Sequence, residues 1–502
     1  MQSENSEIDV LLIEPPFTRL MGQYSIRFPL NLGYLAAALR RHCNVRIYNM
    51  EDPLSEDDEH LRTRPEHAVI NYSEAFARSE KYKDALDSDS QPAFTEARQV
   101  FSKYKPGIIG ITCMSAKYPS ALKVAAIYRS CVPDGIIIWG GQHPTIRTKQ
   151  VLSSGMADVI VRGEGEETLT ELVGHLRQHG MTGGLDKIKG ISFRRDNSII
   201  HTEDRGLLPD IDRLGFPARD LLMKPIKNKV IYGAMITSRG CPFRCGYCSA
   251  RAIWSRKVRY RSVPHVIEEI EMVKAQYGIR DFFLWDDCLT TGRTRTLELM
   301  SAMKKTNTQW ACTTRVDIVD RQILKEMRKA GCVSIDYGIE TGSDRMLEKI
   351  GKDTTTDQVA DAIRYTADAG IIPNAFLMIG FPDETEEDIR STIEFARTTK
   401  AWLLCLSVFT PYPGTPLFER AKEVGLVGDD FDWRETSHQS SRNYFTQCVS
   451  RERFDVLLHE LIDAVDRHNA FLGSRFRRAT AFMMRSPRGF LVKSLAKLNA
   501  RV

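Results

Sequence analysis

The segment RGCPFRCGYC, residues 239–248, places three cysteines at positions 241, 245 and 248. Closely spaced thiolates on a loop are the usual ligands of iron–sulfur clusters. Three such ligands leave one iron of a four-iron cluster without a protein ligand, so that iron is free to bind a small molecule. The neighbouring glycines and proline favour an open loop over a packed core. We therefore predict that Cys241, Cys245 and Cys248 hold a [4Fe–4S] cluster.

The alternatives for these thiols are a zinc site and a set of inert cysteines. Structural zinc normally needs a fourth Cys or His at a second, similar spacing. No histidine lies between His201 and His265, so no such pair stands nearby. The other cysteines are scattered along the chain and the total of eleven is odd. This pattern favours a reduced, cytoplasmic protein over a disulfide framework.

The bulk composition limits the class of protein. A chain of 502 residues has room for several domains, and its hydrophobic content of 42% is enough for ordinary cores. We find no apolar run long enough to predict a transmembrane helix. The first residues, MQSENSEID, are polar and acidic, which argues against a signal peptide. These features also predict a cytoplasmic protein.

The first third of the chain alternates strands with helices, which predicts a parallel, doubly wound α/β sheet. Residues 51–104 interrupt the alternation with an acidic, Ser- and Arg-rich stretch, predicted to be a partly helical insertion with helices near 72–81 and 94–104. Apolar runs predict the strands at residues 9–13, 45–48, 108–112, 135–139 and 159–161. Helical spacing predicts helices at 30–41 and 118–129, and a third helix that follows the fifth strand and ends at residue 176.

Ligands of such sheets bind at the carboxyl ends of the strands. Small and polar residues lie there after the third, fourth and fifth strands, and paired glycines allow a ligand to approach the backbone closely. The predicted ligand contacts of this sheet are Thr112, Ser115, Gly140, Gly141, Gln142, Gly163 and Glu164.

The centre of the chain alternates again and predicts a partial barrel of six β/α units, too few for a closed eight-fold barrel. Helices such as 263–276 and 385–397 separate the strands. The predicted strands are 230–237, 281–285, 309–313, 334–339, 374–379 and 404–409. Polar or small residues follow several of them at the end where active sites of barrels lie. They are Asp286, Asp287, Arg315, Glu340, Gly380 and Tyr412.

These patterns divide the chain into four parts. Residues 1–190 form the N-terminal domain, 191–229 a linker of short strands and turns that crosses between domains, 230–425 the partial barrel, and 426–502 a helical C-terminal region. The last 32 residues, 471–502, carry eight Arg or Lys and no acid. We consider two interpretations of this region: a helical cap over the barrel, and a peripheral contact with a membrane or an anionic partner. No RNA-binding module is recognisable, so we predict no nucleic acid binding.

The cysteine loop, with Tyr247 before its last cysteine, resembles the signature loop of the radical S-adenosylmethionine (SAM) superfamily. The segments GIETGS (338–343), MIGFPDET (378–385) and PYPGTPL (411–417) resemble further motifs of that superfamily. The resemblance implies that the open iron chelates SAM. It also implies that an electron, delivered by an external donor such as flavodoxin or ferredoxin, cleaves SAM to a 5′-deoxyadenosyl radical.

The same resemblance implies roles for individual residues. Asp286 would face the SAM amino group, Arg315 the SAM carboxylate and Glu340 the ribose hydroxyls. Gly380 would let the backbone approach the adenine, and Tyr247 completes the predicted SAM contacts. Asp287 and Tyr412 are the candidates for facing the substrate.

The N-terminal sheet is similar to the cobalamin-binding domain of methionine synthases and mutases. The likeness rests on Thr112-Cys-Met114 after one strand and Gly140-Gly141 after the next, and it implies that these line a slot for the nucleotide tail of cobalamin. Those proteins carry an Asp-x-His-x-x-Gly loop whose histidine ligates cobalt, whereas this chain has EPPFTR at 14–19. The resemblance therefore implies cobalamin binding without that histidine; a domain that no longer binds cobalamin is the alternative. His143 is predicted to lie near the slot or at the surface, not to ligate cobalt.

Together these features predict a cobalamin-dependent radical SAM enzyme. The expected reaction is methylation of an unactivated carbon, or of phosphorus, in a small molecule or natural-product intermediate. The first alternative uses the same architecture for ring formation, ring contraction or oxidative cyclisation. The second is a cobalamin-binding sensor or partner protein without catalysis. A methylthiotransferase acting on RNA is disfavoured, because Cys43, Cys113 and Cys131 do not lie on loops that match its second cluster.

Overall fold

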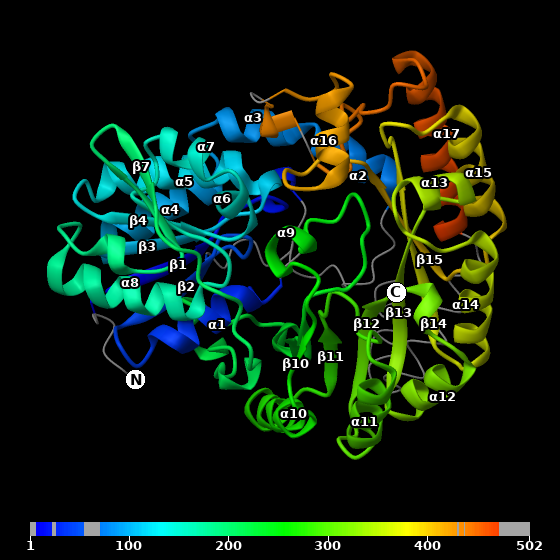
Figure 1. The fold of residues 1–502 in the computed structure, drawn as a ribbon, viewed down its shortest axis with the longest axis horizontal. Coiled ribbons are helices and arrows are strands. Elements are labelled where there is room, and N and C mark those ends of the chain that lie inside the picture. The colour runs from blue at the N-terminus through cyan, green and yellow to red at the C-terminus, as the bar shows by residue number, and fades with distance from the viewer. Residues whose placement is uncertain (1–6, 23–26, 55–70, 429–430, 436, 471–502) are drawn as a thin grey trace, which may run out of the picture.

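The N-terminal domain is built on a seven-stranded sheet. The computed structural model describes residues 7–22, 27–54, 71–428, 431–435 and 437–470. The strand order is β2-β1-β3-β4-β5-β6-β7, and β1 to β5 pair in parallel (Figure 1). The strands are β1 Val10–Glu14, β2 Val45–Asn49, β3 Ile108–Thr112, β4 Ile136–Gly140, β5 Val159–Val161, β6 Ile191–Arg195 and β7 Ser198–His201. The predicted doubly wound α/β sheet is confirmed.

One part of this sheet lies where the sequence predicts a linker. The strands β6 and β7 pair antiparallel with each other, and β6 pairs antiparallel with β5. They therefore extend the N-terminal sheet by an antiparallel hairpin at one edge. The short apolar stretch Ile191-Ser-Phe193 is buried, which explains why this part of the chain joins the sheet instead of crossing freely between domains.

Helices cover both faces of the sheet because its central strands are apolar on both sides. The predicted insertion holds α2, α3 and α4, and its residues 55–70 lie outside the described part of the chain. The helices are α1 Leu30–Leu39, α2 Tyr72–Ser79, α3 Lys81–Asp87, α4 Pro92–Tyr104, α5 Tyr118–Cys131, α6 Gln142–Ile146, α7 Thr148–Ser153 and α8 Glu166–His179.

The second sheet is a six-stranded parallel one, which confirms the predicted partial barrel. Its order is β15-β14-β13-β12-β11-β8. The strands are β8 Ala234–Met235, β11 Asp281–Leu284, β12 Gln309–Thr314, β13 Cys332–Glu340, β14 Ile372–Ile379 and β15 Leu403–Val408. A two-stranded ribbon, β9 Ser238–Arg239 with β10 Arg259–Tyr260, stands beside it. The helices are α9 Ala250–Trp254, α10 Val263–Tyr277, α11 Arg293–Met303, α12 Arg321–Lys329, α13 Asp344–Lys349, α14 Thr356–Asp368, α15 Glu386–Thr398, α16 Pro416–Glu423 and α17 Arg451–Ala470.

The first barrel strand is much shorter than the sequence predicts. A 3₁₀ turn occupies Lys229–Gly233, and the ladder covers only Ala234 and Met235. The strand ends early because the backbone N–H of Thr237 donates to the Asp286 carboxylate, 3.1 Å away, and not to a neighbouring strand. A side chain from the loop after β11 thus replaces the ladder bond.

Alternation along the strands separates an outer and an inner face of the barrel. On β13 the outer residues Ile335, Tyr337 and Ile339 are buried, and the Tyr337 hydroxyl lies 2.8 Å from Thr366 of the covering helix α14. Asp336 therefore points to the inner face, where it accepts a hydrogen bond from Asn374 Nδ2 of β14 at 2.8 Å. The same alternation on β14 turns Phe376 inward, where its side chain stays 38% exposed.

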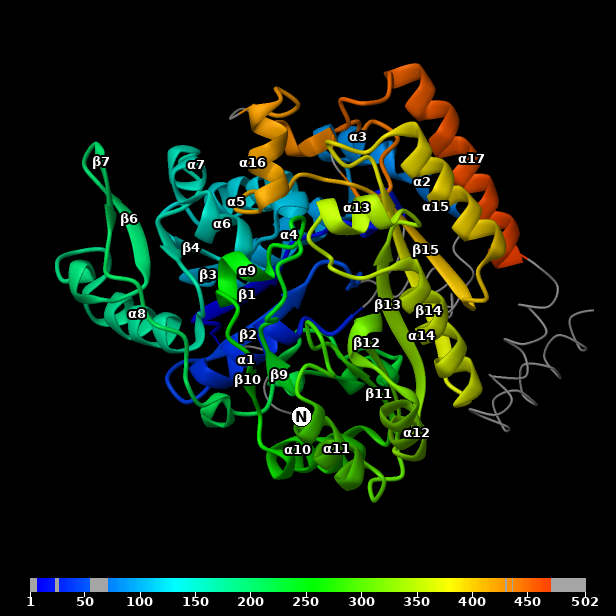
Figure 2. The same ribbon diagram turned by 45° about the vertical axis from the view of Figure 1, so that its right-hand side comes forward.

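The C-terminal helix joins the barrel to the N-terminal domain. On α17 the residues Phe454, Leu457 and Leu458 are buried, and the helix packs against α15 and β15. From its other side Asp466 accepts the backbone N–H groups of Tyr72 (2.7 Å) and Ser73 (3.1 Å) at the start of α2. Figures 1 and 2 show α2 beside α17. The helix thus covers the β15 side of the barrel. The basic stretch 471–502, which the other interpretation places against a membrane or an anionic partner, lies outside the described residues.

Within the described part of the chain, no helix is long and apolar enough to cross a bilayer.

Candidate active site

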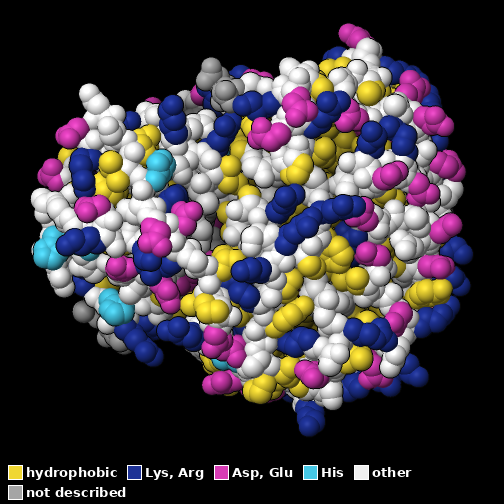
Figure 3. All heavy atoms as spheres, viewed as in Figure 1, with side chains coloured by type: hydrophobic (Ala, Val, Ile, Leu, Met, Phe, Trp, Pro, Cys, Tyr) yellow, Lys and Arg dark blue, Asp and Glu magenta, His cyan; other side chains and the backbone are white. Residues whose placement is uncertain are grey.

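One large cavity lies between the two domains. Its volume is about 530 Å³, within the usual range of ligand pockets. One wall is the carboxyl edge of the N-terminal sheet, with Gly140 and Gly141. The opposite wall is the cysteine loop and the barrel mouth, with Cys248 and Trp285. In Figure 3, apolar side chains show at the boundary between the two lobes, with Lys and Arg beside them. The cavity therefore joins the two sites that the sequence predicts separately.

The three motif cysteines lie on a loop, residues 240–258, that the ribbon β9–β10 closes. All three are free and half-buried. Burial raises the pKa of the Cys241 and Cys248 thiols to about 11, so metal binding would have to displace their protons. Among the described residues no three His, Cys, Asp or Glu side chains gather around a single ion position. In a four-iron cluster each thiolate binds a different iron, so the three sulfurs need no common centre.

The adjacent acids after β11 have different environments. Asp286 is buried, and its carboxylate accepts hydrogen bonds from the Thr237 backbone and hydroxyl and from the Ser238 hydroxyl. Asp286 is not part of the cavity wall, whereas Asp287 is. The Asp287 carboxylate accepts the backbone N–H of Gly240 at 3.0 Å. Burial raises the pKa of both carboxyl groups. Of the two, Asp287 has the position that suits a ligand contact.

Glu340 belongs to a buried network at the end of β13. Its Oε1 accepts hydrogen bonds from the Tyr247 hydroxyl (2.8 Å) and from Lys352 Nζ (2.9 Å). A register shift between Gly338 and Glu340 leaves Glu340 with a φ of +74°, a strained backbone conformation for a non-glycine residue. The bulge turns the carboxylate back towards Tyr247 and the cysteine loop. Sequence reasoning missed Lys352, since nothing in its neighbourhood marks it as a partner of Glu340.

The remaining predicted residues, Arg315, Gly380 and Tyr412, each have different surroundings. Arg315 donates from Nε and Nη2 to both oxygens of Asp317 (2.9 Å each), and its Nη1 lies 3.4 Å from Cys245 Sγ. Gly380 has a φ of +90°, and its N–H donates to Glu384. Tyr412 packs parallel to Trp433, and its hydroxyl lies 3.0 Å from His438 Nε2. Tyr412 is not part of the cavity wall, so its surroundings do not favour a substrate contact.

Six of the seven residues predicted to contact cobalamin line the cavity: Thr112, Gly140, Gly141, Gln142, Gly163 and Glu164. The backbone of Gly141, at a φ of +96°, passes so close to Cys113 that a Cβ would lie 3.0 Å from its carbonyl oxygen. The Thr112 hydroxyl accepts from Asn31 Nδ2 at 2.9 Å, and Asn31 also lines the cavity. This edge therefore offers backbone and small polar groups to a ligand.

Ser115 is the exception, because it faces a histidine and not the cavity. Its hydroxyl lies 2.9 Å from His143 Nδ1. His143 is completely buried between Tyr118 and Trp433, and burial lowers its pKa to about 3. Of the two positions predicted for His143, the surface one is therefore wrong: the residue lies inside the domain, next in sequence to Gln142 of the cavity wall, and its imidazole stays neutral.

A buried charge cluster occupies the place of the histidine-bearing loop after β1. Lys117 donates to Glu14 (2.5 Å) at the end of β1 and to Glu51 (2.9 Å) beyond β2. Glu51 also accepts the backbone N–H groups of Phe17 and Arg19, which fixes the chain after the two prolines. The pKa of Glu51 is lowered by Lys117 and these N–H groups, although burial acts in the opposite direction. The loop is thus held by charged hydrogen bonds within the domain.

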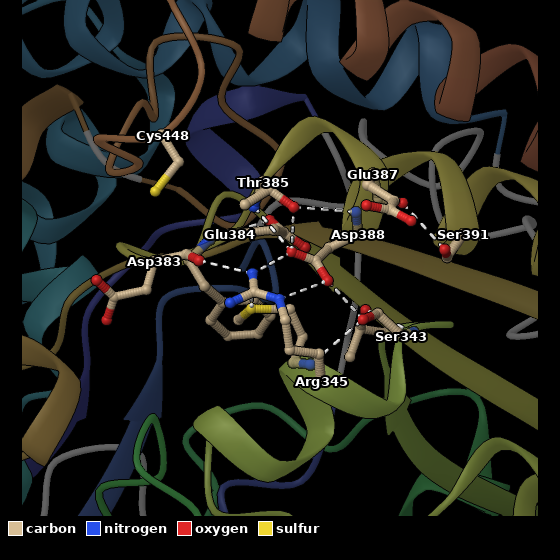
Figure 4. Close-up of polar contacts among 12 residues, drawn as sticks. Ser343, Arg345, Asp383, Glu384, Thr385, Glu387, Asp388, Ser391 and Cys448 are labelled. Atoms are coloured by element: carbon tan, nitrogen blue, oxygen red, sulfur yellow. Dashed lines mark hydrogen bonds and ion pairs between the residues drawn. The ribbon is translucent and has the colours of Figure 1, made fainter.

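A further buried acid lies after β14 (Figure 4). Glu384 accepts the N–H groups of Gly380 and Phe381 through Oε2, while its Oε1 has no hydrogen-bond partner among the described residues. Burial raises its pKa to about 8. The neighbouring Asp388 is paired with Arg345, and its pKa is about 2. Burial and ion pairing therefore shift the pKa values of these two neighbouring carboxyl groups in opposite directions.

The fold and this site define a class: an α/β protein in which a cobalamin-type sheet faces a radical SAM-type barrel. The sequence matches two family profiles, one described as the B12 binding domain over residues 68–173 and one described as the Radical SAM superfamily over residues 235–396. An uncharacterised methyltransferase of Pyrococcus horikoshii is 31% identical over 435 residues, which cover 85% of each chain.

Other known proteins share parts of this likeness. The anaerobic magnesium-protoporphyrin IX monomethyl ester cyclase of Cereibacter sphaeroides is 31% identical over 337 residues, covering 65% of this chain and 55% of the cyclase. The structure of the radical SAM methyltransferase TsrM from Kitasatospora setae shares the fold, with a TM-score of 0.67 at 17% identity, over 92% of this chain and 89% of that one. The chain therefore belongs to the radical SAM superfamily, among the enzymes that carry a B12-binding domain.

The cofactors of this class are a [4Fe–4S] cluster, SAM and cobalamin, and the residues present fit them. The free thiol of Cys248 opens onto the cavity, and Cys241 and Cys245 share its loop. The glycine-rich sheet edge on the facing wall leaves its backbone open: a Cβ at Gly163 would meet no atom within 4 Å.

Proposed function

We propose that this enzyme methylates an unactivated carbon of a largely apolar, ring-bearing small molecule bound at the mouth of the barrel. The observation that carries the proposal is the single cavity of about 530 Å³, which is lined both by the sheet edge with Gly140 and Gly141 and by Cys248 of the cysteine loop. A methyl donor on one wall and a radical source on the other would meet a substrate placed between them.

The residues of this chain would divide the work as follows. Cys241, Cys245 and Cys248 would hold the iron–sulfur cluster, and the glycine edge of the sheet would cradle cobalamin. When bound, the cluster supplies the electron that cleaves SAM, and cobalamin supplies the methyl group. Asp287 at the cavity wall would orient SAM by hydrogen bonds. Glu340, held beside the cysteine loop by its bond to Tyr247, would act from behind that wall.

Two aromatic side chains support an apolar, ring-bearing substrate. Trp285 at the end of β11 lines the cavity, and Phe376 lies on the inner face of β14; each is 38% exposed. Aromatic rings that stay open inside a barrel favour stacking against a flat or cyclic ligand. The guanidinium of Arg27, 4.6 Å from the Trp285 ring, adds a positive charge beside that surface.

The test uses SAM with an isotopically labelled methyl group. Cells with and without the gene are grown on labelled methionine, and metabolites that carry the label only when the gene is present are candidate products. The purified enzyme, reconstituted under reducing, anaerobic conditions, is then given the unmethylated form of each candidate. We expect a labelled product, together with S-adenosylhomocysteine and 5′-deoxyadenosine in equal amounts. The variant Cys245→Ala should form neither the product nor 5′-deoxyadenosine.

A second candidate is a non-methylating radical reaction such as oxidative ring formation. It is favoured by the 31% identity to a magnesium-protoporphyrin IX monomethyl ester cyclase. An unlabelled product formed with 5′-deoxyadenosine and without S-adenosylhomocysteine would establish this reaction and refute methyl transfer.

A further inference from the structure

A buried group of four charges joins the base of the cysteine loop to the N-terminal domain. The ribbon β9–β10 pairs Arg239 directly with Arg259, so the two arginines mark the two ends of the loop. Glu164 and Glu166 lie just beyond β5, at the carboxyl edge of the N-terminal sheet. Two positive side chains from the barrel side thus meet two negative ones from the cobalamin side.

The contacts among these four residues are close. Arg239 donates from Nη1 to Glu164 Oε1 (2.8 Å) and from Nη2 to Glu166 Oε1 (2.5 Å). Arg259 donates from Nη1 to the other oxygen of Glu164 (2.7 Å). The side chain of Arg239 is 8% exposed, and that of Glu164 is also 8% exposed. Charge-assisted hydrogen bonds of this kind are strong and directional, and little water is present to screen them.

The rest of the loop is tied to this group. Trp254 lies near both guanidinium groups, with its ring centroid 5.8 Å from Arg239 and 5.5 Å from Arg259. Gly240, between Arg239 and Cys241, donates its N–H to Asp287. A Cβ at Gly240 would lie 2.1 Å from the Lys257 carbonyl oxygen, so the two strands of the loop are in close contact there. A displacement of Arg239 would therefore move Cys241 with it.

We propose that Arg239 is a positioning residue: its two-pronged pairing with Glu164 and Glu166 fixes the distance between the iron–sulfur cluster and the cobalamin-binding edge. A buried ion pair contributes little net stability, since desolvation offsets much of the attraction. It does select one arrangement, because any other leaves a charge buried without a partner. Here the partners belong to different domains, so the arrangement that is selected is that of one domain against the other.

The consequence for the reaction rests on the proposed function. Two cofactors held on separate walls act on one substrate only when their separation is correct, and a misplacement of about 1 Å can cost roughly 10²-fold in rate. Without the pairing, SAM cleavage at the cluster would continue, because the cluster and its SAM contacts stay on the barrel. Transfer to the substrate would fall, so 5′-deoxyadenosine would form in excess over product.

The test measures the distance between the cofactors and does not need the substrate. In the reduced holoenzyme the cluster and cob(II)alamin are both paramagnetic, and their dipolar coupling, measured by pulsed electron paramagnetic resonance, falls steeply with separation. The variants are Arg239→Gln, Arg239→Lys and Glu166→Gln. The matched control is Arg40→Gln, which removes an exposed pair of two hydrogen bonds between Arg40, just after α1, and Asp220 in the connection to the barrel.

We expect Arg239→Gln to bind iron and cobalamin in wild-type amounts but to show a weaker coupling and a broader distance distribution. Arg239→Lys and Glu166→Gln each keep one of the two hydrogen bonds, so their coupling should be intermediate. The coupling in Arg40→Gln should match that of the wild type. Wild-type coupling in Arg239→Gln would overturn the proposal. If Arg239→Gln does not fold, Glu166→Gln decides by the same measurement. Because both cofactors are bound whether or not a methyl group is transferred, failure of the proposed reaction would not alter this result.

Discussion

The Nη1 atom of Arg315 lies 3.4 Å from the sulfur of Cys245, while the rest of its guanidinium is paired with Asp317. The side chain of Arg315 is 6% exposed and stacks over Phe243 with a separation of 3.9 Å. A positive group thus donates a hydrogen bond to one of the predicted cluster ligands. Because Asp317 fixes the guanidinium by two bonds, this contact is oriented before any cluster is bound.

The first prediction concerns this contact. Arg315→Gln removes a charged donor to the sulfur, and a hydrogen bond to a charged group stabilises it by about 1.5–3 kcal/mol. The reduced cluster is more negative, so it should lose more of this stabilisation than the oxidised cluster. We therefore expect a lower midpoint potential and slower SAM cleavage. Electron paramagnetic resonance during a redox titration measures the potential. Arg293→Gln, which removes an exposed pair with Asp320, is the control. An unchanged potential would show that Arg315 has only a structural role.

The second prediction concerns the buried pair of Lys352 and Glu340. Lys352→Met leaves the Glu340 carboxylate buried without its cation, which costs about 3–5 kcal/mol of unfolding free energy. The double variant Lys352→Met with Glu340→Gln should recover part of this loss, since no buried charge then remains. Lys304→Met, at a more exposed pair with Glu326, should cost only about 0.2–1 kcal/mol. Urea unfolding followed by tryptophan fluorescence compares the variants; equal losses at the two sites would contradict the prediction.

The third prediction concerns the bulge at the end of β13. A Cβ at Gly338 would lie 2.5 Å from Glu340 Oε1 and 2.9 Å from Lys352 Nζ, so Gly338→Ala must displace one of them. We expect a loss of about 1–3 kcal/mol of stability and weaker SAM binding by the cluster-loaded enzyme. Gly174→Ala on α8, where a Cβ meets no atom within 4 Å, should instead stabilise by about 0.5–1 kcal/mol. Thermal unfolding and equilibrium dialysis with labelled SAM are the measurements, and wild-type SAM affinity in Gly338→Ala would refute the steric argument.

The fourth prediction concerns pH and Glu384. Its folded pKa of about 8 lies above the ordinary value of 4.5, so the folded state keeps a proton that the unfolded state has lost. Stability should therefore fall as pH rises from about 4.5 to about 8 and level off above that window. Glu384→Gln keeps the acceptor for the Gly380 and Phe381 N–H groups and removes this slope. Its advantage over the wild type should grow with pH to the order of a few kcal/mol.

The control for this prediction is Glu386→Gln on the adjacent helix. The Glu386 carboxylate is exposed, and Arg453 and Arg390 lower its pKa to about 2, so it stays ionised over the whole window. Its replacement should leave the slope unchanged. Thermal midpoints measured at about pH 5, 7 and 9 separate the two variants. Parallel pH profiles for Glu384→Gln and the wild type would be inconsistent with a protonated Glu384.

The periodic parts of the fold are predictable from the sequence, and the pairings across it are not. Five of the six barrel strands agree with the apolar runs to within two residues at each end, because each run reflects its own burial. The strand at 230–237 fails because its length depends on Asp286, which lies just after β11 and accepts the Thr237 N–H. The sequence around Thr237 or Asp286 cannot predict this contact, because the two residues are 49 positions apart.

The same limit applies to the site. Glu164 is predicted to contact cobalamin because it follows a strand, and it does line the cavity. Its carboxylate, however, accepts hydrogen bonds from Arg239 and Arg259. Asp286 and Asp287 are equivalent in the sequence, yet one is enclosed by Thr237 and Ser238 and the other borders the cavity. The ends of the strands predict where the site lies. The role of each side chain within the site depends on hydrogen-bond partners that are distant in the sequence.

The contact of Asp466 with the start of α2 has a consequence for dissecting this protein. The C-terminal helix that packs on the barrel also caps a helix of the N-terminal domain, and Ser79 of α2 donates to the carbonyl of Gln439. The two domains are therefore fastened at a second place, remote from the loop of Arg239. A protease cut in the connection between β7 and β8 would sever the chain there without releasing either half. Two separately expressed fragments should for the same reason reassemble when mixed, and neither fragment should behave as an independent domain.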